Sequence, residues 1–292
     1  MTNKSHRRFL WQFDQEFKKN APQPERLALY IAGMEHPEID INAYMTQIDE
    51  IAAYIDDALS DSARGLTRAE QFLYIFNHEL GFTGNKKQYF SADNSFLNKV
   101  LEQRTGLPIM LSLVCIAIGR RIRIDIEGMG FPAHFMVRYQ DEEGSWILDP
   151  FNGVVMSHRE VETYIESLLQ KPIRLHRNYF KPIQPNILAQ RILNNLRMVY
   201  LNDKDYLKAV DVLDYLLLIE PTYPPFWQER GLLNSHSDEW EAAYRDIRRY
   251  FFLTGQLGVA LDWYIPDKRL SNETRQMLNI FEQIEQMRLM IN

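Results

Sequence analysis

The chain of 292 residues contains one cysteine, Cys115, so no disulfide can form within it. Such a composition is typical of proteins that work in a reducing compartment. The longest apolar run, residues 107–119, is too short to cross a bilayer, and the charged amino-terminal segment lacks the apolar stretch of a signal peptide. We therefore expect a cytoplasmic protein that has no membrane-spanning helix and no membrane partner.

The sequence also lacks an excess of basic residues. Its 33 lysines and arginines are outnumbered by 39 aspartates and glutamates, which gives a net charge of −6. A nucleic-acid-binding protein needs a basic surface to neutralise phosphates, so no nucleic-acid partner is predicted.

The common spacings of metal ligands are absent as well. None of the seven histidines has a second histidine three or four residues away, and there is no pair of cysteines. No glycine-rich phosphate-binding loop is present either. We therefore predict neither a metal nor a cofactor.

Helical periodicity dominates the first part of the chain. Apolar residues recur at helical spacing over residues 24–34, 41–59 and 67–80. In the third segment Thr67 and Glu70 have the spacing of a capping box. The chain up to residue 80 is therefore predicted to be all helical.

Two further helices follow a polar loop. The first covers residues 95–104, and Asn94 or Ser95 is expected to cap it. The second runs from Pro108 to residue 121, and its proline suits the first turn of a helix. Because this second helix is apolar on nearly every side, we expect it to be buried.

The periodicity changes to two residues after Ile124. Residues 135–139 (FMVRY) and 145–149 (SWILD) are predicted strands of a hairpin that turns at residues 141–144. A short strand at residues 154–156 and a helix close this part of the chain. The pattern predicts helices packed on a small antiparallel sheet.

The last third of the chain is again helical and contains an internal repeat. A shift of about 34 residues, the length of a tetratricopeptide repeat, places Ala209 on Ala243. Trp227, Gly231 and Pro221 also resemble that repeat in their positions. A tail helix follows, and one of its faces carries Met277, Phe281 and Ile284.

We therefore predict two domains and an α+β class. Residues 1–180 would form a papain- or transglutaminase-like domain with a helical extension at its amino terminus. Residues 181–292 would form tetratricopeptide-like helical repeats with a capping helix.

The order of helix, His134 and Asp149 resembles that of a papain-like active site. A Cys–His–Asp triad needs a thiolate at a helix start, a histidine base and an aspartate that orients this base. At the helix start the sequence has Pro108. Spacing alone leaves a second interpretation open, in which His134 is an ordinary core histidine and Asp149 ends a strand at a turn.

Three blocks of sequence resemble the transglutaminase-like superfamily. They are LNKVLEQRTGLPIMLSLVCIAIGRRIRI, PAHFMVRY and WILDP. The resemblance is stronger to the bacterial SirB-type invasion-regulator family, which joins such a core to tetratricopeptide repeats. It implies that Gly106, His134 and Asp149 match residues of the superfamily's active site, and that Pro108 stands where active members have the cysteine. Thiol chemistry at position 108 is then impossible.

Two nearby residues are conceivable replacements for the thiol. Ser112 and Cys115 lie four and seven residues after Pro108 on the same helix face. We expect Cys115 to be buried and inert, and Ser112 to hydrogen-bond the backbone.

The polar residues near the helix start are candidates for lining a cleft. They are Asn94, Ser95, Asn98 and Ser112.

Three hypotheses follow. In the first, the chain is a non-catalytic regulatory protein, a pseudoenzyme that binds a protein or peptide through its cleft and repeats. In the alternative, it is a hydrolase or acyl-transfer enzyme of altered chemistry that uses His134 and Asp149. In the third, compatible with the first, these two residues only hold the hairpin in place.

Overall fold

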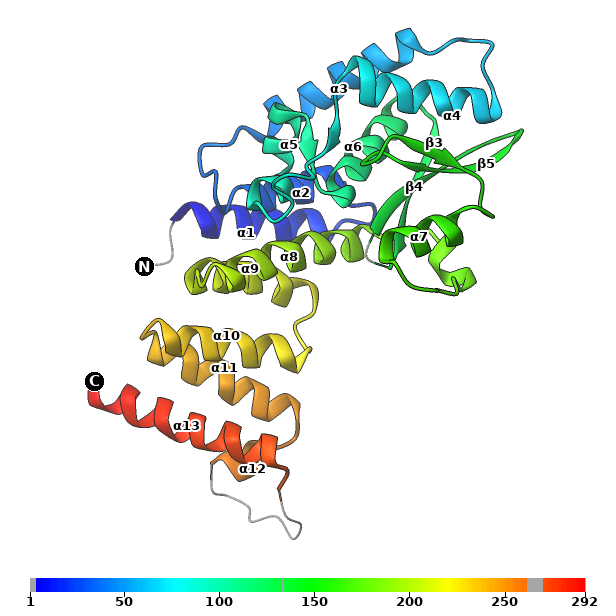
Figure 1. The fold of residues 1–292 in the computed structure, drawn as a ribbon. Helices are drawn as coiled ribbons and strands as arrows, with labels where there is room; N and C mark the ends of the chain where they lie inside the picture. The colour runs from blue at the N-terminus through cyan, green and yellow to red at the C-terminus, as the bar shows by residue number, and fades with distance from the viewer. Residues whose placement is uncertain (1–3, 133, 262–269, 292) are drawn as a thin grey trace. The chain divides into compact units, whose positions relative to one another are not determined.

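The computed structural model describes residues 4–132, 134–261 and 270–291 (Figure 1). The chain forms two compact units, residues 1–192 and residues 193–292. The boundary falls within helix α8 (Pro185–Asn202).

Helices form the first part of unit 1, as predicted. They are α1 (Lys4–Phe17), α2 (Pro24–Ala32), α3 (Ile41–Ala58) and α4 (Gly65–Tyr74). The predicted capping box is wrong, because α4 begins at Gly65 and therefore contains Thr67 within its first turn. The backbone N–H of Gly65 donates to Oδ2 of Asp141 at 2.7 Å, so a carboxylate from the sheet caps this helix.

A π-helical turn, Ile75–Glu79, continues α4. A helix with this wider hydrogen-bond pattern projects its side chains differently from a regular α-helix and is often found beside functional sites. Here the turn carries Asn77, whose amide is described below.

A short parallel ladder links the polar loop to the buried helix. Strand β1 (Thr83–Gly84) pairs with β2 (Thr105–Gly106), and between them lie a 3₁₀ turn (Ala92–Ser95) and α5 (Leu97–Gln103). The next helix, α6 (Pro108–Arg121), is buried from Pro108 to Gly119, as predicted.

The predicted cap of α5 is wrong. Phe96 occupies the N-cap position of that helix and makes no capping side-chain hydrogen bond. Neither Asn94 nor Ser95 takes that role, because both lie in the preceding 3₁₀ turn.

Four antiparallel strands form the sheet in the order β3-β4-β5-β6. They are β3 (Asp125–Phe131), β4 (His134–Asp141), β5 (Gly144–Asp149) and β6 (Val154–Met156). In the registers of these pairs, Phe131 is opposite His134, Val137 is opposite Leu148 and Asp149 is opposite Val154. The hairpin predicted around residues 141–144 is β4–β5.

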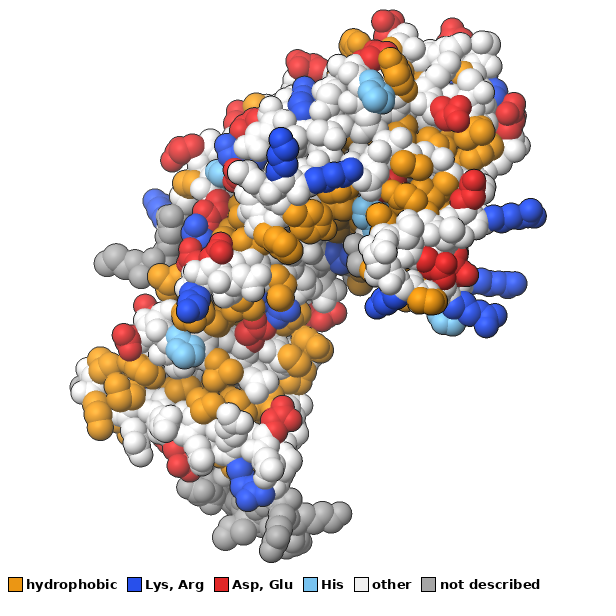
Figure 2. Space-filling view, viewed as in Figure 1, with side chains coloured by type: hydrophobic (Ala, Val, Ile, Leu, Met, Phe, Trp, Pro, Cys, Tyr) orange, Lys and Arg blue, Asp and Glu red, His pale blue; other side chains and the backbone are white. Residues whose placement is uncertain are grey.

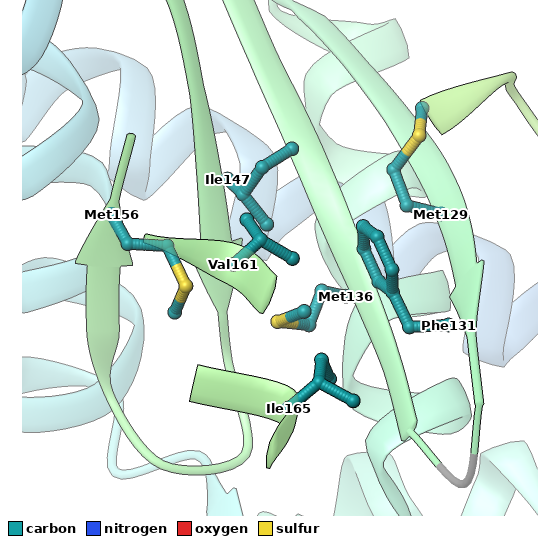
Figure 3. Packing of buried hydrophobic residues seen from close by; sticks show 7 residues of the cluster. All are labelled: Met129, Phe131, Met136, Ile147, Met156, Val161 and Ile165. Carbon is teal, nitrogen blue, oxygen red and sulfur yellow. The ribbon is translucent and has the colours of Figure 1, made fainter. Parts of the chain in front are cut away.

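Helices cover both faces of this sheet. On one face a buried cluster joins the strands to α7 (Val161–Leu169), as Figure 3 shows. Its members are Met129, Phe131, Met136, Ile147, Met156, Val161 and Ile165. On the other face, a Cβ atom at Gly128 would lie 3.1 Å from Cδ1 of Ile116 in α6. Neighbouring residues of a strand point to opposite faces, so α6 and α7 enclose the sheet.

Unit 2 is made of paired helices. They are α9 (Tyr206–Ile219), α10 (Pro224–His236), α11 (Trp240–Leu253), α12 (Leu257–Ala260) and α13 (Asn272–Ile291). A Cβ atom at Gly231 would lie 2.6 Å from Cδ1 of Ile247, so α10 and α11 pack closely where the repeat pattern predicts a small residue.

The predicted apolar face of the tail helix packs on α11. Met277, Phe281 and Ile284 are buried in one cluster with Ala243 and Ile247. The α+β sheet domain followed by an all-helical region is thereby confirmed. None of the helices in the described ranges is long and apolar enough to cross a membrane.

Candidate functional site

The start of α6 and the turn after Asp149 meet at Gly84. Gly84 is the register partner of Gly106, which lies two residues before Pro108. The backbone N–H of Gly84 donates to the carbonyl oxygen of Phe151 at 3.2 Å. A Cβ atom at position 84 would lie 2.5 Å from the Phe151 ring, so this close approach requires glycine.

His134 and Asp149 form a buried pair. Nε2 of His134 lies 2.8 Å from Oδ2 of Asp149. The exposed fraction of the histidine side chain is 8%, and that of the aspartate is 0%. The sequence predicted this pair, and the β4–β5 hairpin brings its two members together at one end of the sheet.

Four other hydrogen bonds saturate the carboxylate of Asp149. Its Oδ1 accepts from the backbone N–H groups of Phe151 and Asn152, at 3.0 and 3.3 Å. Its Oδ2 accepts from Nδ2 of Asn152 at 2.8 Å and from the hydroxyl of Tyr164 at 2.5 Å. Buried charges are tolerated only when they are hydrogen-bonded in this way.

These contacts keep Asp149 ionised. Burial alone would raise its pKa, but the hydrogen bond and charge of His134, with the hydrogen bonds from Tyr164 and Asn152, outweigh burial and lower the pKa below its ordinary value. Burial and the bond to Asp149 raise the pKa of Tyr164, which therefore stays a neutral donor.

An ionised Asp149 fixes a proton on the nitrogen of His134 that faces it. Nε2 must hold the proton that is donated to the carboxylate, so in the neutral form of the ring Nδ1 keeps its lone pair. Within the described ranges no residue hydrogen-bonds Nδ1. The site therefore offers an oriented imidazole acceptor, or a base if a nucleophile were brought to it.

Aromatic rings flank this histidine. The ring of Phe151 meets the His134 ring edge-to-face at 6.0 Å, and Tyr89 meets Phe151 in the same manner at 6.1 Å. Tyr89 belongs to the polar loop after β1, so that loop borders the site.

No free nucleophile stands at the start of α6. Pro108 is its first residue and brings neither a thiol, a hydroxyl nor a backbone N–H. The hydroxyl of Ser112 is fully buried and donates to the carbonyl of Phe135 at 3.4 Å. Cys115 is also fully buried, and burial raises the pKa of its thiol well above the ordinary value.

The structure separates the four predicted cleft-lining residues. Ser112 contacts β4, next to His134. Asn94 is buried and holds the loop after β1. Ser95 ends the 3₁₀ turn before α5, and Asn98 lies in the first turn of α5, where it hydrogen-bonds Tyr44 rather than either residue of the pair. Among the described residues, Ser95 Oγ and Asn98 Oδ1 are buried without a hydrogen-bond partner.

Sequence reasoning missed three residues that support the site. Asn152 follows Asp149 at the spacing of a side-chain turn, a signal that could have been used. Tyr164 carried no such signal, because its role depends on how α7 packs. Asn77 donates to the carbonyls of Phe82 and Pro150 at 2.7 and 2.8 Å, and only the π-helical turn places it there.

Comparisons with known proteins agree with this architecture. A family model described as the transglutaminase-like superfamily matches residues 42–194, and a tetratricopeptide-repeat model matches residues 196–279. A UPF0162 protein of Xylella fastidiosa (strain 9a5c) is 32% identical over 231 residues, which are 77% of this chain and 82% of that protein.

Two further relatives are more distant. A UPF0162 protein of Vibrio cholerae is 24% identical over 217 residues, 74% of this chain and 80% of its own length. Protein SirB1 of Salmonella typhimurium is 24% identical over 203 residues, 68% of this chain and 76% of its own length.

Proposed function

The chain belongs to the transglutaminase-like superfamily, and from this premise we propose that it is a non-catalytic regulatory protein that binds a protein or peptide partner. Its combination of a transglutaminase-like domain and tetratricopeptide repeats fits such a role. A single buried cysteine suits the reducing cytoplasm, where we place its work.

The observation that carries the proposal is Pro108 at the first position of α6. The resemblance to the superfamily assigns this position to the nucleophilic cysteine. Proline removes the thiol and also the backbone N–H that could stabilise an oxyanion at the helix start. Ser112 and Cys115 do not replace it, since the hydroxyl is hydrogen-bonded to Phe135 and the thiol is buried.

The groups that remain are suited to recognition. Nδ1 of His134 is an oriented acceptor, and the Phe151 ring beside it offers an apolar surface. A buried, saturated carboxylate holds this arrangement rigid, and rigid sites lose less entropy when a ligand binds. Tetratricopeptide repeats suggest protein–protein interaction as the second mode of binding.

One observation favours a second candidate function, hydrolysis. The His134–Asp149 pair keeps the geometry of a general base and its orienting carboxylate. A water molecule or a bound hydroxyl of the substrate would then serve as the nucleophile. We place this candidate second, because the first turn of α6 supplies no group that would attack the substrate.

The test is affinity capture with the full chain as bait in extracts of the source bacterium. Two variants divide the possible binding surfaces. His134→Gln keeps a donor for Asp149 but removes the Nδ1 acceptor, and Arg249→Glu changes an arginine of the repeats that packs against Trp227 and Phe252. We expect one variant to release the partner while both remain folded at the temperature of the capture.

The same preparations are assayed on a panel of amides and esters. The proposal expects no turnover by wild type. Turnover that disappears in His134→Gln would instead support the hydrolase. Absence of any partner that depends on either surface would contradict the binding proposal.

A further inference from the structure

The loop after β1, which comprises residues 85–90, presents aromatic side chains to solvent. Within it, Phe90 is 76% exposed and Tyr89 is 37% exposed. Exposed aromatic rings that lie side by side are characteristic of interaction sites. On the face drawn in Figure 2, hydrophobic side chains of unit 1 lie at the surface beside lysine or arginine side chains.

The loop is held in one conformation by Asn94. Nδ2 of Asn94 donates to the carbonyls of Gln88 and Tyr89 at 2.6 and 3.1 Å, and its Oδ1 accepts from Nδ2 of Asn85 at 3.0 Å. The side chain of Asn85 in turn accepts from the backbone N–H of Gln88 at 3.0 Å. The exposed rings are therefore preorganised, which lowers the entropic cost of binding.

Two lysines of this loop carry positive charge to its surface. Lys86 and Lys87 are exposed, and within the described parts of the chain no carboxylate forms an ion pair with either. Nζ of Lys86 lies 5.9 Å from the centroid of the Phe151 ring, which also contacts His134. Two unpaired cations beside two exposed rings thus border the His134 site of a chain with a net charge of −6.

We propose that the loop after β1 docks an acidic, aromatic- or leucine-containing segment of a partner protein. Carboxylates of this segment pair with Lys86 and Lys87, and its apolar side chain packs on Tyr89 and Phe90. The inference rests on the proposed binding function and names the chemistry of the partner at the His134 site. Charge complementarity selects an acidic segment.

A nucleic acid fits the same loop less well. Two lysines neutralise too few phosphates to hold a polynucleotide at physiological salt, and binding of this kind relies on many cations. Two carboxylates spaced along a peptide match two lysines. Binding of a labelled oligothymidine would therefore contradict the proposal.

The experiment begins with selection of random dodecapeptides, displayed on phage, against the full-length protein. Enriched peptides are then synthesised with a fluorescein label, and their affinities are measured by fluorescence anisotropy. We expect aspartate or glutamate next to an aromatic residue or leucine in the enriched sequences. Binding should weaken as salt is added, because both lysines are exposed.

Two variants of the loop test its role. The double variant Lys86→Glu/Lys87→Glu should weaken binding by about tenfold or more, since two attractions become repulsions. Phe90→Ser should weaken it by about tenfold through loss of apolar contact. Because these side chains are exposed, neither variant should change the melting temperature.

Matched controls change the same chemistry elsewhere. Lys171→Glu/Lys181→Glu makes an identical change of charge at two exposed lysines, and Tyr74→Ser removes a ring that is 58% exposed. Both should leave affinity within about twofold of wild type, a difference well below 1 kcal/mol.

Besides binding of oligothymidine, three results of the peptide experiment would overturn the inference. They are enrichment of neutral or basic peptides, equal binding by the loop and control variants, and no enrichment at all. A cellular partner that binds through His134 or the repeats, and that tolerates the Lys86→Glu/Lys87→Glu change, would contradict this inference but leave the proposed function standing.

Discussion

Removal of the Tyr164 hydroxyl tests whether Asp149 is a buried anion that depends on its donors. Tyr164→Phe deletes the 2.5 Å hydrogen bond to Oδ2 of Asp149 and the acceptor for Nδ2 of Asn152. Hydrogen bonds to charged groups contribute about 1.5–3 kcal/mol each. We expect that loss in the free energy of unfolding, which lowers the melting temperature of a unit of this size by about 3–12 °C.

The effect should depend on pH with a defined sign. The pKa of Asp149 in the folded protein lies below its ordinary value of 3.8, so the unfolded chain takes up the proton first as pH falls. The stabilisation is complete well above the unfolded pKa and is lost as pH falls through the folded pKa. The difference between wild type and Tyr164→Phe should therefore be full at neutral pH and shrink in acid.

The assay is calorimetric unfolding of both proteins across this pH range. Tyr54→Phe is the matched control, because Tyr54 donates to a carboxylate oxygen of Glu79 at 2.9 Å on the surface. That exposed bond should contribute less than about 0.5 kcal/mol. Equal destabilisation by the two variants, or a Tyr164→Phe deficit that does not change with pH, would refute the account of Asp149.

Three other changes test the start of α6 and the repeats. Pro108→Cys should create a thiol that iodoacetamide alkylates more slowly than a free cysteine, because α6 is buried from position 108 onward; buried Cys115 leaves wild type as an unreactive background. Arg230 donates two hydrogen bonds to the buried carboxylate of Asp246, at 2.7 and 2.8 Å. Arg230→Ala would leave this carboxylate without its guanidinium partner and should lower the free energy of unfolding of the repeats, measured in urea, by about 3–5 kcal/mol. Arg248→Ala, at an exposed arginine of the same repeats, should change stability by less than about 0.5 kcal/mol.

Local patterns in the sequence predicted the sheet and the repeats well. The change of period after Ile124 and the turn residues 141–144 predicted the hairpin, although helices bury residues on both faces of its strands. The spacing of Met277, Phe281 and Ile284 predicted the face that α13 buries. In these cases the residues that carry the pattern are close together in the sequence.

The wrong predictions of helix caps concerned residues whose partners are decided by the fold. The start of α4 is determined by Asp141, which lies in the sheet far along the chain from Gly65. Asn94 has the chemistry of a helix cap, yet the backbone it satisfies belongs to the loop before it. Propensity describes what a side chain can bond, whereas the fold decides which backbone groups are available.

The candidate site was predictable in part for the same reason. His134 and Asp149 could be paired from a hairpin, since the two strands are adjacent in sequence. Tyr164 could not, because its hydroxyl reaches Asp149 only after α7 packs on the sheet. The basic and aromatic character of the loop after β1 is visible in the sequence, but its closeness to Phe151 is a property of the fold.

The central claim is that this chain binds its partner without changing it covalently. The most direct measurement is the intact mass of the captured partner after prolonged incubation with wild type and with His134→Gln. The account predicts the same mass for the partner in both samples and in its free form. A partner that is cleaved, deamidated or crosslinked by wild type, and left intact by His134→Gln, would contradict it.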